Sequence, residues 1–207
     1  NQAHQRYFQE TYQRKTNFIP NGVNRPQRVP AAVIREKWGL EKDGYILYLG
    51  RIVPEKGEQY LCEAYRKLRT EKKLVFAGES AGGGLIYALT LKLKQLGMPL
   101  PGGLIAISPW TDLTSSGRFY DLNRDVDPSM SRERLQYYAS LYTIGGTSLD
   151  EPLVSPLFGD LTEMPPSLIF VGGDEVMLDD AVKLHEILCQ NGCRSHLTIA
   201  PGMWHVY

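Results

Sequence analysis

Short apolar runs alternate with helix-like segments along most of the chain. The runs Tyr45–Leu49 and Leu74–Ala77 have the length and composition of buried parallel strands. Apolar residues recur at helical spacing between them, and a second helix-like segment follows at about 85–96. Further strands are expected at 104–108, 167–171 and 197–200. This alternation predicts an α/β fold, a three-layer sandwich around a mostly parallel sheet.

Residues 111–165 interrupt this alternation. The segment is rich in proline and contains one helical stretch, near Arg132–Tyr142. We interpret it as a cap-like excursion from the sheet.

The strand at 74–77 leads directly into a G-x-S-x-G pentapeptide, Gly78-Glu79-Ser80-Ala81-Gly82. A strand, a tight glycine turn and a helix form the context in which this pattern makes a nucleophile elbow. The glycines are expected to leave room for the sharp turn, and the following helix N-terminus favours negative charge near Ser80. The alternative is a glycine-rich turn with an incidental serine.

Two further groups follow strands in the order that a Ser-acid-His triad requires. Asp174 comes after the strand at 167–171, and His205 comes after the strand at 197–200. The carboxyl ends of parallel strands share one edge of a sheet, so both residues are expected near Ser80. A serine hydroxyl needs such a base and an orienting acid to act as a nucleophile.

Five collinear motifs resemble the hormone-sensitive-lipase-like branch of the α/β-hydrolase fold, a family of serine carboxylesterases. They are GESAGGG at 78–84, LIAISPWTDLTSSG at 104–117, SPLFGDL at 155–161, VGGDEVMLDDA at 171–181 and PGMWHVY at 201–207. The resemblance implies Ser80 as nucleophile, Asp174 as acid and His205 as base. It also implies that Ala81 donates its backbone N–H to the oxyanion. Glu79 stands where the family more usually has aspartate or threonine.

Residues 1–77 resemble a different family, the nucleotide-sugar-binding half of family 4-type glycosyltransferases. The motifs are NQAHQRYFQETYQRKTNFIPNGV, YILYLGRIVPEKG and YLCEAYRKLRTEKKLVFAG. The resemblance places Arg51 and Lys56 at a donor diphosphate, and the alternative is a basic surface loop. Together the two resemblances predict a chimera of segments 1–77 and 78–207 in one continuous domain. The strands at 45–49 and 74–77 should then be neighbours in a single sheet.

The His-Gly-Gly oxyanion motif of the esterase family is absent from residues 1–77. We expect a backbone N–H at Gly50–Ile52, or the Arg51 cation, to replace the missing donor. The predicted function is hydrolysis of small esters, weakened by this loss. Candidates for an acyl pocket are aromatic residues that could equally fill the core: Trp110, Phe119, Tyr137, Tyr138 and Tyr142. The alternatives are a non-catalytic chimera with a vestigial triad and a nucleotide-sugar-binding fragment.

Composition narrows the possible partners. The formal net charge is zero, which disfavours nucleic acid, and no apolar run approaches the ~20 residues of a membrane span. Cys62, Cys189 and Cys193 form no disulfide framework or metal motif, which favours reduced thiols in a cytoplasm-like compartment. We therefore expect a cytoplasmic protein that binds a small-molecule ester and uses no cofactor or metal. The oligomeric state stays open.

Overall fold

The structure is a computed structural model that describes residues 10, 13, 35–36, 45–49 and 73–207. The chain divides into two compact units, Asn1–Val33 and Ile34–Tyr207. The sheet, the helices and the site presented below all belong to the second unit.

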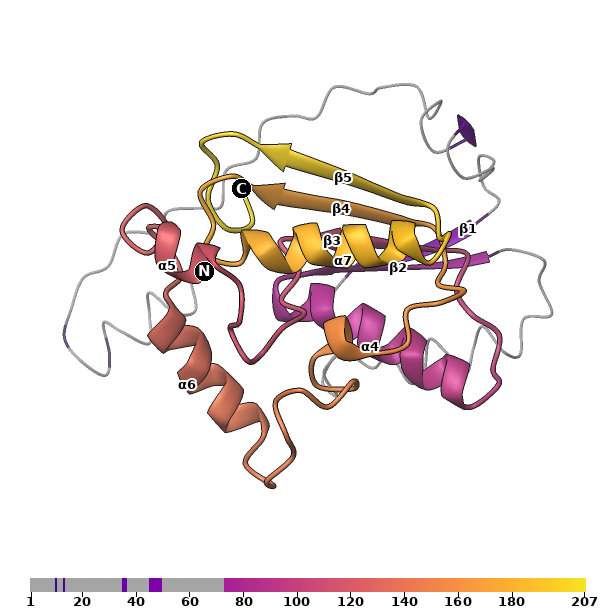
Figure 1. Ribbon diagram of the computed structural model, residues 1–207, viewed down its shortest axis with the longest axis horizontal. Coiled ribbons are helices and arrows are strands. Elements are labelled where there is room, and N and C mark those ends of the chain that lie inside the picture. The colour runs from indigo at the N-terminus through magenta and orange to yellow at the C-terminus, as the bar shows by residue number, and fades with distance from the viewer. Residues whose placement is uncertain (1–9, 11–12, 14–34, 37–44, 50–72) are drawn as a thin grey trace. The chain divides into compact units, whose positions relative to one another are not determined.

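A parallel sheet with strand order β1-β2-β3-β4-β5 forms the frame of this unit (Figure 1). The strands are β1 (Tyr45–Leu49), β2 (Lys73–Glu79), β3 (Gly103–Ile107), β4 (Ser167–Gly172) and β5 (Ser195–Ala200). Each strand pairs in parallel with the next along the chain. The predicted α/β class and the predicted pairing of the strands at 45–49 and 74–77 are both confirmed. The predicted segment boundary between residues 77 and 78 falls inside β2.

Helices α4 (Ala81–Gln95) and α7 (Leu178–Gln190) carry the main core. The first packs on β2 and β3, and the second on β4 and β5. Their apolar stripes meet the buried residues of the central strands in one cluster that includes Ile86, Tyr87, Leu104, Ile169 and Leu184. Burial of these apolar side chains is the main force that holds both helices against the sheet.

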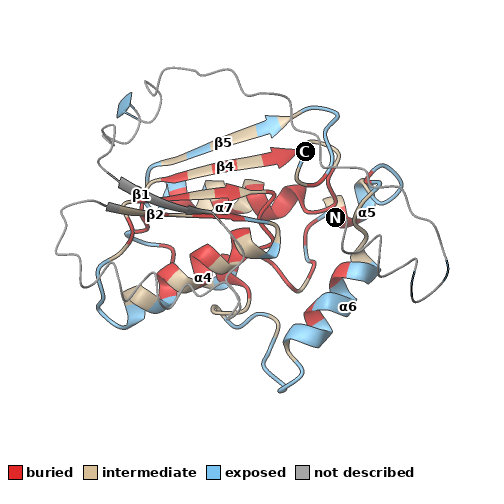
Figure 2. Cartoon of the chain, turned by 180° about the vertical axis from the view of Figure 1, so that it is seen from behind, coloured by how far each residue is buried: buried red, intermediate tan, exposed pale blue. Residues whose placement is uncertain are grey.

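The excursion at 111–165 contributes to a second, smaller core, which Trp110, Val176 and Met177 share. It contains α5 (Phe119–Leu122), α6 (Arg132–Tyr142) and the 3₁₀ helix η2 (Pro156–Phe158). The Ser131 side chain caps α6 by accepting a hydrogen bond from the N–H of Arg134. Leu135 and Ala139 are the buried residues of α6, and the rest of that helix is largely exposed (Figure 2). No helix in the described part of the chain is long and apolar enough to cross a membrane.

Candidate active site

Ser80 lies in a sharp turn between β2 and α4. Its φ of 54° is unusual for a residue with a side chain. The backbone holds this conformation from two sides, since the Ser80 N–H donates to the Ile107 carbonyl at 2.9 Å and the Trp110 N–H donates to the Ser80 carbonyl at 2.9 Å. A Cβ at Gly78 would lie 2.2 Å from the Gly82 carbonyl oxygen, so the turn requires glycine there. The turn does not require glycine at position 82 for lack of space, because a Cβ there would meet open space.

His205 contacts the Ser80 hydroxyl. Its Nε2 lies 2.8 Å from Ser80 Oγ, and the ring is buried, with 8% of the residue exposed. The loop that carries His205 is tied to the end of β4, because the Gly173 N–H donates to the Ala200 carbonyl and the Asp174 N–H donates to the Met203 carbonyl. Two predicted residues, one from the end of β2 and one from beyond β5, are therefore brought together as expected.

The acid beside His205 is Glu175, and the prediction of Asp174 for this contact is wrong. His205 Nδ1 lies 2.9 Å from Glu175 Oε2, and Glu175 is fully buried. The turn after β4 directs the longer glutamate side chain inward, where the Gly172 N–H donates to its Oε1 at 2.6 Å. The Asp174 side chain is half-buried, and its backbone N–H supports the His205 loop. Sequence reasoning chose the wrong member of an adjacent Asp-Glu pair.

An ionised carboxylate can only accept hydrogen bonds, so the Glu175 carboxylate selects the tautomer with a proton on His205 Nδ1. Nε2 is then free to accept the Ser80 hydroxyl proton. The arrangement has the chemical form of a nucleophile, a base and an orienting acid.

Two side chains from the excursion fix the segment that carries Glu175. Asn123 Nδ2 donates to the carbonyls of Gly173 and Glu175, at 3.1 and 2.9 Å. Asp127 Oδ2 accepts the Val176 N–H at 3.0 Å. Partial burial would raise the pKa of Asp127, but the Val176 N–H and further donors at Ser129 and Met130 outweigh it and hold the pKa below its usual value. Sequence reasoning missed both residues, because neither lies in a motif.

Of the predicted oxyanion groups, the structure describes Ala81. It is the first residue of α4 and is exposed beside Ser80, where a helix N-terminus favours negative charge. Gly50, Arg51 and Lys56 lie outside the described residues, so the predicted replacement donor and phosphate contacts stay predictions.

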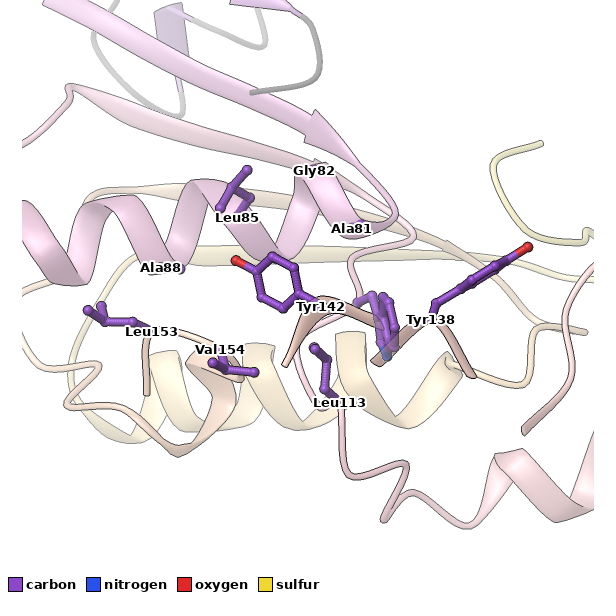
Figure 3. A pocket seen from close by; sticks show the side chains of 11 residues that line it. Ala81, Gly82, Leu85, Ala88, Leu113, Tyr138, Tyr142, Leu153 and Val154 are labelled. Carbon is purple, nitrogen blue, oxygen red and sulfur yellow. The ribbon is translucent and has the colours of Figure 1, made fainter. Parts of the chain in front are cut away.

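A cavity of about 290 Å³ opens beside the N-terminus of α4 (Figure 3). It is lined mainly by apolar and aromatic residues, among them Ala81, Gly82, Leu85, Trp110, Leu113, Tyr138, Tyr142, Leu153 and Val154. Trp110, Tyr138 and Tyr142 were predicted here, whereas Phe119 and Tyr137 do not line it. Figure 3 shows the Tyr142 side chain between α4 and the side chains of Leu113 and Val154. Within the part of the chain that the structure describes, no cluster of His, Cys, Asp or Glu could hold a metal ion.

The parallel sheet, the strained serine turn and the Ser-His-Glu contacts are typical of the α/β-hydrolase fold. The model of the alpha/beta hydrolase fold family matches residues 58–207, and the chain belongs to that family. The match begins upstream of the predicted boundary at 77–78, and nothing in the comparisons supports a glycosyltransferase-like first part.

Its relatives include an esterase from Acinetobacter venetianus, 37% identical over 65% of this chain and 44% of the relative. An acetyl-hydrolase from Streptomyces hygroscopicus is 36% identical over 70% of this chain and 49% of the relative. The crystal structure of an esterase from the bacterial hormone-sensitive lipase family superposes with a TM-score of 0.65 at 38% identity. It covers 72% of this chain and 48% of that one. The chain thus spans about half the length of the relatives it matches.

Proposed function

We propose that this chain hydrolyses small carboxylic esters through an acyl-enzyme on Ser80. The observation that carries the proposal is the unbroken contact series from Ser80 Oγ through His205 to the Glu175 carboxylate. The family of the chain and the esterase and acetyl-hydrolase names of its relatives support the reaction class.

In the first half of the reaction, His205 Nε2 takes the Ser80 proton as Ser80 Oγ attacks the ester carbonyl carbon. Glu175 stabilises the imidazolium that forms, and the Ala81 N–H donates to the developing oxyanion. His205 then gives its proton to the alkoxide as the C–O bond breaks and the alcohol leaves. In the second half, His205 takes a proton from water, the hydroxide attacks the acyl-enzyme, and Ser80 recovers its proton as the acid is released.

The cavity beside Ala81 suits a short acyl chain. Its volume of about 290 Å³ lies just below the ~300–1,000 Å³ usual for ligand pockets. The absence of a His-Gly-Gly motif from residues 1–77 suggests that turnover is slow. Losing one oxyanion donor elsewhere costs about 10²–10³ in rate.

Hydrolysis of p-nitrophenyl butyrate tests the proposal. Wild-type activity should vanish in Ser80→Ala, because the variant lacks the hydroxyl that forms the acyl-enzyme. Glu175→Gln should lower kcat by a factor on the order of 10³–10⁴, since it no longer selects the tautomer that the reaction needs. Asp174→Asn is the matched control and should stay within a few-fold of wild type.

Two outcomes would contradict the proposal. A Ser80→Ala variant as active as wild type would exclude the acyl-enzyme. An inactive wild-type chain with intact folding would favour the alternative of a non-catalytic domain with a vestigial triad. The predicted nucleotide-sugar site rests on residues outside the described part, and we propose no function for it.

A further inference from the structure

Ser108 follows β3, the strand between those that lead to Ser80 and Glu175. It is fully buried, and its backbone has a φ of 48°, in the region that side-chain-bearing residues rarely adopt. Its N–H donates to the Phe170 carbonyl at 2.7 Å, which pins it between the central strands. A buried residue in this conformation is held there by its surroundings and frequently serves a site.

The Ser108 hydroxyl makes two contacts, one to the acid Glu175 and one to the backbone of the residue that follows the base His205. It donates to Glu175 Oε1 at 2.6 Å, and it accepts the N–H of Val206 at 3.1 Å. Val206 directly follows His205 and has a φ of 54°, which is strained for a β-branched residue. One small group therefore touches both the acid and the backbone that carries the base.

The two Ser108 contacts fix parts of the site that the Glu175–His205 hydrogen bond does not hold, namely the second Glu175 oxygen and the backbone after His205. Glu175 Oε2 faces His205, and Oε1 is held by the Gly172 N–H and the Ser108 hydroxyl. Without the hydroxyl, Oε1 keeps one donor and the Val206 N–H loses its acceptor. Both changes loosen the position of the imidazole relative to Ser80.

We propose that Ser108 is a positioning residue that aligns Glu175 and His205 together. It acts through those two residues and does not contact substrate. The proposal rests on the proposed esterase function for its kinetic readout, but the hydrogen bond between His205 and Glu175 reports on it independently.

The test compares Ser108→Ala and Ser108→Gly in the full chain. Both remove the hydroxyl, but glycine adopts the positive φ freely and should be the more stable of the two. We expect kcat for p-nitrophenyl butyrate to fall about 10- to 100-fold in both, with KM nearly unchanged, as a small misplacement of catalytic groups causes. Ser115→Ala is the matched control, because Ser115 is also fully buried with a φ of 56° and makes none of these contacts. Its kcat should stay near wild type.

The second readout is the low-field proton NMR signal of His205 Nδ1–H, assigned by its loss in Glu175→Gln. It should be sharp in wild type and Ser115→Ala, and shifted or broadened in both Ser108 variants. If Ser108→Gly is more stable than Ser108→Ala and recovers kcat to the same extent, the proposal is overturned. A purely structural role predicts that result. An unchanged NMR signal in both variants would overturn it as well, whether or not the wild-type chain hydrolyses esters.

Discussion

Asp180 is a fully buried carboxyl in the first turn of α7. Its Oδ2 accepts the N–H groups of Thr111 and Asp112 at 2.9 and 2.8 Å, and Tyr120 donates to Oδ1 at 3.2 Å. Burial, reinforced by the nearby Asp112 carboxylate, outweighs these donors and raises the pKa of Asp180 to about 8. The residue ties the start of the excursion to α7 while holding a proton near neutral pH.

This raised pKa makes stability depend on pH in a definite direction. The folded state binds the Asp180 proton more tightly than the unfolded state, so the stability gained at low pH is lost as pH rises from about 4 towards the folded pKa of about 8. Each unit of pKa difference is worth about 1.4 kcal/mol. Asp180→Asn imitates the neutral form and should flatten this decline.

Urea unfolding at pH 5, 7 and 9 measures the effect. The free energy of unfolding should fall with pH more steeply in wild type than in Asp180→Asn, with the variant relatively more stable at pH 9. Asp125→Asn, at an exposed aspartate, should leave the wild-type slope unchanged. Identical slopes for wild type and Asp180→Asn would show that Asp180 ionises normally.

The sequence was informative about residues when a strand end fixed their position. Ser80 and His205 each follow a strand, and the structure brings them into contact. The choice between Asp174 and Glu175 depended on which side chain the turn after β4 directs inward, and no periodicity reports that. Ser108 was also hidden, because a serine after a strand becomes informative only when its partners, 67 and 98 residues away, are known.

At the scale of elements, the glycines at 82–84 matter more for the packing of α4 than for the turn at Ser80. The sequence predicts a helix from about Leu85, since glycine disfavours helix, but α4 begins at Ala81. A Cβ at Gly84 would lie 2.0 Å from the Trp110 carbonyl oxygen, so α4 approaches the chain after β3 too closely for any side chain. Tertiary contact therefore overrides helix propensity. The short α5 and η2 escaped prediction because four and three residues are too few to show a periodic signal.

A pair of alanine substitutions separates these two roles of glycine. Gly84→Ala should destabilise the protein by about 1–3 kcal/mol or more, because the new methyl group must displace backbone. Gly82→Ala meets open space and should be neutral or stabilising by up to about 1 kcal/mol through its better helix propensity. Equilibrium unfolding in urea checks both values, and equal effects of the two substitutions would refute the packing argument.

At the scale of the whole unit, α4 and the excursion line the cavity jointly. Ala81, Leu85 and Ala88 come from α4, whereas Tyr138 and Tyr142 come from α6. The apolar lining suits a hydrocarbon chain, and on the proposed function we expect the excursion to limit the length of that chain.

Truncation of the cavity wall should change the preferred chain length of the ester. Tyr142→Ala should raise kcat/KM for octanoate relative to butyrate esters by several-fold, since it removes a ring from the wall. Tyr137→Ala is the matched control, because both tyrosines lie on α6 and are 61% exposed, but Tyr137 does not line the cavity. An equal shift in both variants would mean that α6 affects the substrate through some route other than this wall.

The site joins strands that are far apart in the sequence, so it forms only after those strands have paired. The hydrogen bond between His205 and Ser80 joins residues 125 positions apart, and those of Ser108 join residues 67 and 98 positions apart, so a fragment that lacks β2 or β3 cannot form the complete site. His205 follows β5, which is the last strand of the described sheet. The residues of β5 are exposed or half-buried. Fraying of that strand alone would withdraw the base from Ser80 while the core between α4 and α7 stayed intact. On the proposed function, ester hydrolysis would then report the docking of this one strand, and inactivation on heating would come before the loss of the helices.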